Sequence, residues 1–137
     1  MKITLYFLSL VLLAACNAGK TFDRAEDAQD AGRQFIRASL DGDYEKAKFY
    51  MLQDSVNQLL ISKWQAGFDQ LDRATRQQYR EASILPISIT KLNDSLTTYT
   101  YSNSFRKDTT TVRIVRVDGD WLVDLKEILN SKNSYRP

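Results

Sequence analysis

The hydrophobic pattern of this chain changes its period near residue 84, and this change constrains the fold more than any other feature. Before that point, apolar residues recur every three or four positions, which is the spacing of amphipathic helices. After it, apolar and polar residues alternate, which is typical of strands with one buried face. The pattern therefore predicts an α+β fold, in which N-terminal helices pack on one face of a curved four-stranded antiparallel sheet.

The first two helices have recognisable caps. Asp23 and Glu26 fit a capping box, so the first helix is predicted to begin at Asp23. Small and apolar residues then share one face of that helix: Ala28, Gly32, Phe35, Ile36 and Ser39. Asp41-Gly42-Asp43 is predicted to end this helix and to cap the next. The second helix is expected to carry the apolar residues Tyr44, Ala47, Tyr50 and Met51.

A third helical stretch is predicted to begin near Ser55 and to run to about Arg80. Gly67 lies inside it, so the pattern allows either a kink or a split into two helices. Its expected apolar residues are Val56, Leu59, Leu60, Trp64, Phe68 and Leu71.

The last two strands are joined by Val117-Asp118-Gly119-Asp120, which carries the Asp-Gly signal of a two-residue hairpin turn. This turn predicts three facing pairs: Arg116 with Trp121, Ile114 with Val123, and Arg113 with Asp124. A slip of one residue would place an apolar side chain opposite a carboxylate, so this register is favoured. It also predicts an Arg113–Asp124 ion pair on the polar face.

The same reasoning applies to the upstream hairpins. A turn at Lys107-Asp108 would place Tyr99 opposite Arg116 and Tyr101 opposite Ile114. A loop at Asn93-Asp94-Ser95 would place Ile89 opposite Tyr99 and Ile87 opposite Tyr101. One sheet face is then expected to lie under the helices, and it comprises Leu85, Ile87, Ile89, Tyr99, Tyr101, Asn103, Phe105, Val112, Ile114, Arg116, Trp121, Val123 and Leu125.

This order of elements resembles the nuclear transport factor 2-like superfamily. The resemblance rests on Gly42-Asp43-Tyr44-Glu45-Lys46-Ala47 and on the closing hairpin Val117-Asp118-Gly119-Asp120-Trp121-Leu122-Val123. Within the superfamily, the chain is similar to small bacterial lipoproteins whose domain has no assigned function, over about residues 22–128. The resemblance implies a cone-shaped fold with a pocket between helices and sheet, often dimeric. It implies no reaction, because the superfamily includes isomerases, dehydratases and binding modules.

The N-terminus has the layout of an export signal. Lys2 precedes an apolar stretch that is shorter than the about 20 residues of a membrane-spanning helix. Leu13-Ala14-Ala15-Cys16 resembles the lipobox of bacterial lipoproteins, in which the Cys thiol is acylated and the preceding residues are removed. We therefore expect a signal peptide over residues 1–15, a lipidated Cys16 with a tether over 16–21, and a single domain over 22–137.

The lipobox also predicts where the protein acts. A lipid anchor would hold it in the bacterial cell envelope, and we expect the outer membrane, facing the periplasm. Its partners would then include the membrane itself. The polar sheet face carries Val115, Val117 and Leu122 among threonines, so it could also pair with a second copy or with another envelope protein.

Composition excludes several kinds of chemistry. The chain has no His and one Cys, which removes the nucleophilic triads and the usual zinc sites. We expect no metal and no cofactor. The 19 basic and 17 acidic residues nearly balance, so there is no electrostatic case for nucleic acid as a partner.

Polar and aromatic groups on the predicted apolar face mark the candidate site, for which no catalytic residue is assigned. They are Tyr99, Tyr101, Asn103, Phe105, Arg116 and Trp121. One interpretation is a small pocket for an aromatic or lipid-like molecule, oriented by a few polar groups. The other is a filled core, with the tyrosine hydroxyls at its rim and Arg116 stacked on Trp121.

The sequence thus favours a non-catalytic envelope protein that binds a small hydrophobic ligand or a protein partner. The alternative is an enzyme of the isomerase or dehydratase kind that uses the same pocket. Such an enzyme would need a carboxylate within hydrogen-bond reach of Tyr99 or Tyr101. The helices could supply one from Asp69 or Asp72.

Overall fold

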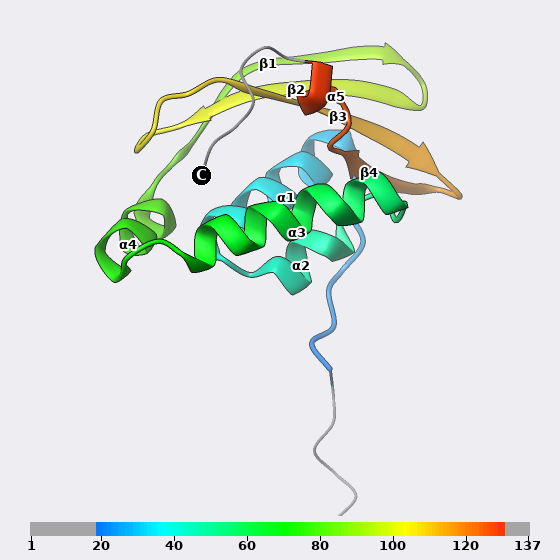
Figure 1. Cartoon of the computed structure of the whole chain (residues 1–137). Coiled ribbons are helices and arrows are strands. Elements are labelled where there is room, and N and C mark those ends of the chain that lie inside the picture. The colour runs from blue at the N-terminus through cyan, green and yellow to red at the C-terminus, as the bar shows by residue number, and fades with distance from the viewer. Residues whose placement is uncertain (1–18, 131–137) are drawn as a thin grey trace, which may run out of the picture.

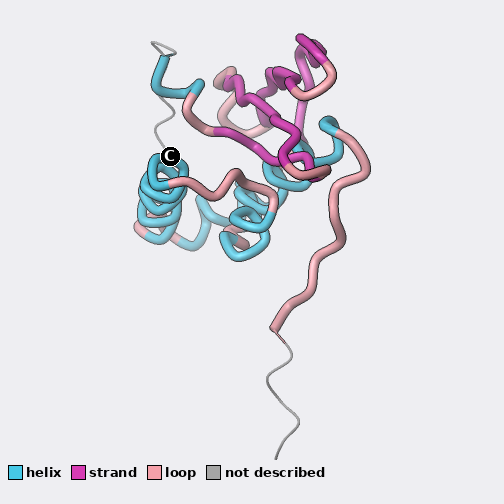
Figure 2. Tube along the Cα trace, turned by 90° about the vertical axis from the view of Figure 1, so that its right-hand side faces the viewer, coloured by secondary structure: helices cyan, strands magenta, loops and turns pink. Residues whose placement is uncertain are grey.

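The structure is a computed structural model, and it describes residues 19–130. It is an α+β fold in which helices pack on one face of a four-stranded antiparallel sheet, as the sequence predicts. Figures 1 and 2 show the first four helices below the sheet in two views related by 90°, while the short last helix lies at the level of the strands. The elements are α1 (Ala28–Asp41), α2 (Tyr44–Phe49), α3 (Ser55–Asp69), α4 (Arg73–Glu81), β1 (Ile84–Asn93), β2 (Leu96–Asn103), β3 (Thr110–Val117), β4 (Asp120–Asp124) and α5 (Glu127–Asn130).

The predicted start of the first helix is wrong, because α1 is capped by Asp27 and not by Asp23. The Asp27 side chain accepts a hydrogen bond from the backbone N–H of Asp30 at 2.7 Å. The carbonyl of Asp23 instead accepts from the Tyr50 hydroxyl at 2.7 Å. That tertiary bond uses the oxygen that a helix starting at Asp23 would need for its first turn.

The boundary between α1 and α2 agrees with the sequence, but α2 ends at Phe49, so Tyr50 and Met51 lie beyond the helix that was expected to carry them. Gly42 ends α1 with a φ of 76°, and the Asp43 side chain caps α2 by accepting from the N–H of Lys46. Of the two alternatives for the long third stretch, a split is confirmed. The break lies between Asp69 and Arg73, where Asp72 caps α4, and not at Gly67.

The buried side of α3 agrees with the predicted one only in part, since Trp64 and Phe68 are buried as expected. Its buried residues are Asn57, Ile61, Trp64 and Phe68. Val56 and Leu59, which were expected to face the core, are exposed. The helix is turned so that the amide of Asn57 meets the end of β4. The spacing of apolar residues alone could not predict this orientation, because the contact is polar.

The β3–β4 hairpin has the predicted register. Arg113 lies opposite Asp124, Ile114 opposite Val123, and Arg116 opposite Trp121. The turn residues Asp118 and Gly119 both have positive φ, at 50° and 88°, as an Asp-Gly turn of this kind requires.

The predicted β2–β3 register is wrong. Tyr99 lies opposite Val112 and Tyr101 opposite Thr110, so the strands are shifted relative to the prediction. The connection between the strands is longer than a two-residue turn. Asn103 Oδ1 accepts hydrogen bonds from the N–H groups of Phe105 and Arg106, so the chain turns at Asn103 and Phe105 does not join the strand. The shift is by an even number of residues, so the two tyrosines keep the predicted face.

The β1–β2 pairing agrees with the prediction only in part. Ile89 lies opposite Tyr99 as expected, but Pro86 and not Ile87 lies opposite Tyr101. The register shifts between Pro86 and Ser88, which leaves Ile87 as an extra residue in a bulge. Leu85 lies opposite Ser102 and therefore belongs to the other face.

The core fills the space between α1, α3 and strands β2 to β4. Its largest fully buried side chains are Phe35, Ile36, Met51, Asn57, Ile61, Tyr99, Val112, Ile114, Val123 and Leu125. Gly32 lets α1 lie directly on the sheet, since a Cβ atom there would lie 2.9 Å from Ile114 Cδ1 and 3.1 Å from Tyr99 Cδ2. The centre of the sheet is therefore filled by the helix itself.

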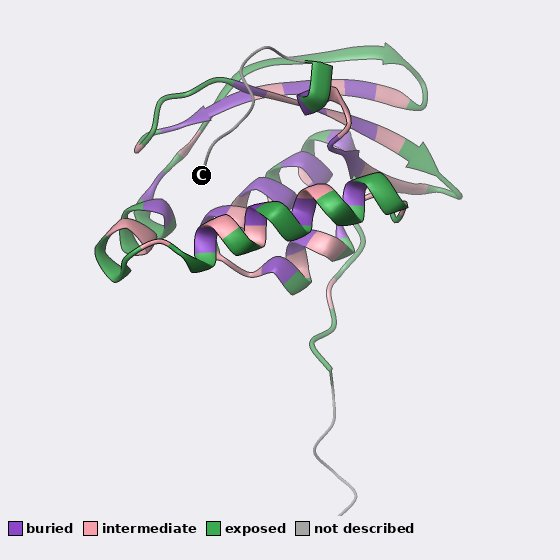
Figure 3. Ribbon diagram, viewed as in Figure 1, coloured by how far each residue is buried: buried purple, intermediate pink, exposed green. Residues whose placement is uncertain are grey.

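The helices do not cover the whole of the face that they were expected to cover. Figure 3 shows β1 as exposed along nearly its whole length, while α1 beneath the sheet is largely buried. Leu85, Ile87, Ile89 and Leu92 are the large apolar side chains that β1 leaves exposed. The reason is topological: β1 is an edge strand, and α1 crosses nearer to the middle of the sheet.

Candidate functional site

The two predicted site residues Tyr99 and Tyr101 lie together on β2. Their ring centroids are 6.1 Å apart, and both side chains are buried. Tyr99 packs against Gly32 of α1, so its ring is part of the core. Only the hydroxyl end of such a side chain is free to take part in binding.

Asn103 and Phe105 lie in and beside the loop that follows β2. The side-chain oxygen of Asn103 is occupied by the N–H groups of Phe105 and Arg106, at 3.0 and 2.8 Å. The ring of Phe105 meets Tyr79 of α4 edge-on, with centroids 5.0 Å apart. Asn103 therefore fixes the shape of the loop, and Phe105 joins the loop to α4.

Arg116 and Trp121 lie at the β3–β4 turn. The Arg116 guanidinium carbon is 5.5 Å from the centre of the Trp121 ring, which is the predicted stacking. Trp121 also lines a small cavity of about 160 Å³ beside Phe49 and Tyr50. The six predicted residues therefore fall into three groups at different places on the sheet.

A larger groove of about 510 Å³ lies between α1 and the beginning of β1. Its lining residues are Gln29, Arg33, Gln34 and Arg37 from α1, Ser83, Ile84 and Pro86 from the start of β1, and Tyr99 from β2. Of the six predicted site residues, Tyr99 is the one that lines this groove. The volume falls within the usual range of about 300–1,000 Å³ for small-molecule sites.

Tyr99 forms part of the inner wall of this groove, and its side chain is only 1% exposed. Across residues 19–130, every fully buried side-chain nitrogen or oxygen has a hydrogen-bond partner. Burial raises the pKa of Tyr99 above its ordinary value, and the charge of Arg33 offsets part of that rise. The hydroxyl is therefore a neutral donor at physiological pH.

The two arginines of the groove have different roles. Arg37 donates to the backbone carbonyls of Ala82, Tyr79 and Arg80, at 2.7, 3.3 and 3.1 Å, and also pairs with Asp41. It joins α1 to the end of α4 and so builds the wall of the groove. Arg33 is more exposed and pairs with Asp30 through one nitrogen, Nη2, at 2.9 Å.

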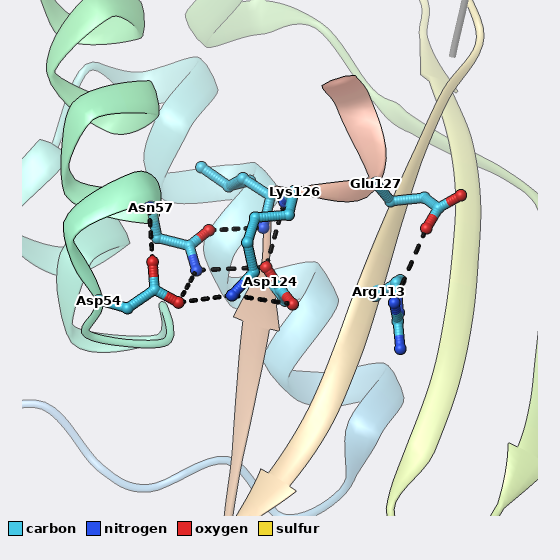
Figure 4. Close-up of polar contacts among 7 residues, drawn as sticks. Asp54, Asn57, Arg113, Asp124, Lys126 and Glu127 are labelled. Atoms are coloured by element: carbon cyan, nitrogen blue, oxygen red, sulfur yellow. Dashed lines mark hydrogen bonds and ion pairs between the residues drawn. The ribbon is translucent and has the colours of Figure 1, made fainter. Parts of the chain in front are cut away.

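A second polar cluster joins α3 to the end of β4 (Figure 4). Asn57 Nδ2 donates to Asp54 at 3.0 Å and to Asp124 at 3.2 Å, while Asn57 Oδ1 accepts from the N–H of Leu125 at 2.7 Å. Lys126 Nζ lies 2.6 Å from Asp54 and 3.6 Å from Asp124. The cluster satisfies the buried Asp124 carboxylate without Arg113.

The predicted Arg113–Asp124 ion pair is therefore wrong, although the two residues are opposite each other in the sheet. Arg113 pairs with Glu127 of α5 at 4.0 Å, as Figure 4 shows. Asp124 ends β4, where its carboxylate meets α3 and Lys126 in place of the neighbouring strand. The sequence contains one signal for this cluster: Asn57 follows the helix cap Asp54 by three residues, a spacing that brings their side chains together.

Hydrogen bonds stabilise the charged forms in this cluster. The backbone N–H of Asn57 and the ammonium of Lys126 lower the pKa of Asp54 from 3.8 to about 2. The same carboxylate raises the pKa of Lys126. Because both groups are held in their charged states by each other, the cluster has the chemistry of a structural contact and not of an acid or base catalyst.

The chain matches no protein-family model and no curated protein. Within the described range, no helix is long and apolar enough to cross a membrane. The same residues contain no group of three or more acidic or Cys side chains placed to hold a metal ion. The groove beside Tyr99 is therefore the candidate site on which a function can be argued.

Proposed function

We propose that this protein is a lipid-anchored envelope protein whose domain binds a small hydrophobic ligand in the groove between α1 and β1. The observation that carries the proposal is a groove of about 510 Å³ that the predicted site residue Tyr99 lines together with Ile84 and Pro86. A concave site with apolar walls and a few polar groups is the usual form of a small-molecule site. A pocket between helices and sheet is also what the resemblance to the nuclear transport factor 2-like superfamily implies.

Binding is a better proposal than catalysis for this groove. An isomerase or dehydratase would need a carboxylate near Tyr99, and none of the described residues that line the groove is acidic. Asp72, one of the two helical candidates, instead caps α4 through the N–H and hydroxyl of Thr75, both at 2.8 Å. Asp69, the other candidate, ends α3 on an exposed surface.

The anchor is the second part of the proposal. Cys16 and the rest of the predicted signal sequence lie outside the described residues, so the expectation of a lipidated protein at the outer membrane rests on the lipobox-like run alone. An anchored domain that holds a hydrophobic ligand could take it from, or pass it to, the adjacent membrane. A second copy or an envelope protein is the alternative partner. Of the residues expected at such a contact, Val117 is exposed while Val115 and Leu122 are half-buried, and β1 adds further exposed apolar residues.

The groove proposal can be tested with a fluorescent apolar probe, 8-anilinonaphthalene-1-sulfonate, titrated into the protein. Gln29 is exposed and lines the groove, so Gln29→Trp should fill the groove without disturbing the core. Gln58→Trp, on the exposed side of α3, is the matched control. We expect saturable binding that weakens at least about tenfold in Gln29→Trp alone. Equal binding by both variants would show that the probe lies elsewhere.

A further inference from the structure

Resting on the groove proposed above, we propose that its ligand is an amphiphile with a carboxylate head, bound between Arg33 and the Tyr99 hydroxyl, and with an apolar tail along Ile84 and Pro86. Arg33 and Tyr99 both line the groove, and Arg33 gives only one of its guanidinium nitrogens, Nη2, to Asp30. The proposal concerns the chemical class of the ligand, which the volume of the groove leaves open.

Arg33 is the cation available to a ligand here. A guanidinium carries five N–H donors, and Arg33 gives one nitrogen to Asp30 at 2.9 Å. Arg37, the other cation in the lining, already donates to three backbone carbonyls and to Asp41. An anion would therefore bind at Arg33 and leave the wall built by Arg37 intact.

Tyr99 supplies the second donor. Its ring is fixed by Tyr101 and by α1, so its hydroxyl has a constant position without a loss of side-chain entropy on binding. Arg33 and Tyr99 both line this groove. A neutral O–H and a guanidinium in one groove suit a carboxylate, which has two oxygens that only accept hydrogen bonds.

The other groups in the groove are compatible with an anion of this type. The amides of Gln29 and Gln34 can donate to it, and no Asp or Glu occurs among the described lining residues. Asp30 is the nearest competitor, because it already shares Arg33. An amine head group would instead meet Arg33 unfavourably, since like charges repel.

The tail end of the groove is apolar. Ile84 and Pro86 alternate toward the inner face of β1, opposite Asn103 and Tyr101. These two side chains offer a short apolar strip that suits an alkyl chain or a flat ring. A medium-chain carboxylate such as decanoate combines this tail with the head group that Arg33 and Tyr99 favour.

Calorimetric titrations with decanoate, decanol and decylamine, each below its aggregation concentration, test this inference. Arg33→Gln removes the charge at an exposed position, and Tyr99→Phe removes the hydroxyl alone. Arg73→Gln, at an exposed position on α4 outside the groove lining, is the matched control for loss of one positive charge. Circular dichroism of each variant confirms that it is folded.

We expect the protein to bind decanoate about tenfold or more tightly than decanol, as one charge-assisted hydrogen bond implies. Arg33→Gln should remove most of the preference for decanoate and leave the affinity for decanol unchanged. Tyr99→Phe should remove part of the same preference. If decanol binds as tightly as decanoate, the carboxylate inference is overturned and the proposed function stands. If none of the three ligands binds, the proposed function itself is overturned. If Arg33→Gln weakens the binding of decanoate and of decanol equally, the inference is also contradicted, because Arg33 would then act by shaping the groove and not by binding the carboxylate.

Discussion

The side-chain amide of Asn57 donates a hydrogen bond of 3.2 Å to the carboxylate of Asp124, and these residues are 67 positions apart in the sequence. The same amide group accepts from the backbone N–H of Leu125, so α3 and the end of β4 are joined by one fully buried side chain. A buried polar group is costly unless each of its hydrogen bonds is made. We infer that Asn57 fixes how α3 is turned against the sheet.

Asn57→Ala should destabilise the domain. It removes the partner of the Leu125 N–H and one partner of the buried Asp124, and each buried group left unpaired costs about 1–3 kcal/mol. Gln58→Ala, at the exposed neighbouring position, should change the unfolding free energy by less than about 0.5 kcal/mol. Urea unfolding followed by circular dichroism measures both, and equal stabilities for the two variants would contradict the assigned role of Asn57.

Asp54 should contribute stability that depends on pH. Its pKa is lowered to about 2 from 3.8, so the folded state favours the carboxylate. Stability from such a group is fully present above about pH 4 and is lost as the pH falls through 2. Asp54→Asn keeps a capping side chain but loses the charge that holds Lys126.

The difference in unfolding free energy between wild type and Asp54→Asn should therefore be largest above pH 4 and should shrink toward pH 2. Urea unfolding at a series of pH values measures it. Asp69→Asn, at the exposed other end of α3, is the matched control for the loss of one carboxylate. A difference that is constant with pH would mean that the carboxylate of Asp54 has no stabilising role.

Substitution of two glycines with positive φ distinguishes the free-energy cost of backbone strain from that of steric overlap. Gly119 has a φ of 88° and no atom close to the position of a Cβ, so Gly119→Ala should cost about 1–2 kcal/mol from the backbone alone. At Gly42, with a φ of 76°, a Cβ would also overlap the ring of Phe68. Gly42→Ala should therefore cost about 1–3 kcal/mol more than Gly119→Ala. Thermal unfolding of both variants checks this order, and the reverse order would contradict the packing of Phe68 under Gly42.

The exposed apolar residues of β1 should matter little for the stability of the domain. Ile87 is 57% exposed and Ile114 is fully buried, so they form a matched pair within one sheet. Ile87→Ala should change the unfolding free energy by about 1 kcal/mol or less, whereas Ile114→Ala should cost about 2–5 kcal/mol. If chemical denaturation shows a large loss for Ile87→Ala that depends on protein concentration, a second copy covers β1.

Cys16→Ser should release the protein from membranes, because the proposed anchor is the acylated thiol. Fractionation of cells that express wild type or variant, with metabolic labelling by an alkyne fatty acid, measures both attachment and modification. The wild type should be labelled and should sediment with membranes. A Cys16→Ser protein that still sediments with membranes would show that another contact holds it there.

The sequence predicts the local features of this fold well. The cap at Asp43, the start of α3 at Ser55, the end of α1 at Gly42 and the β3–β4 register each depend on residues that are close together in the chain. Their signals, a carboxylate before a helix or an Asp-Gly turn, act over a few residues. The candidate site was predicted less completely, since Tyr99 lines the groove while Arg33, Ile84 and Pro86 were not singled out.

The sequence by itself determined the α+β order of elements, because hydrophobic period and turn chemistry are local properties. Only the tertiary structure decided how α1 lies on the sheet, where β1 bulges and which partner Asp124 takes. These features depend on contacts between residues far apart in the chain, so patterns among neighbouring residues do not predict them. The groove beside Tyr99 is of the same kind, since it exists only where α1 stops covering the edge of the sheet.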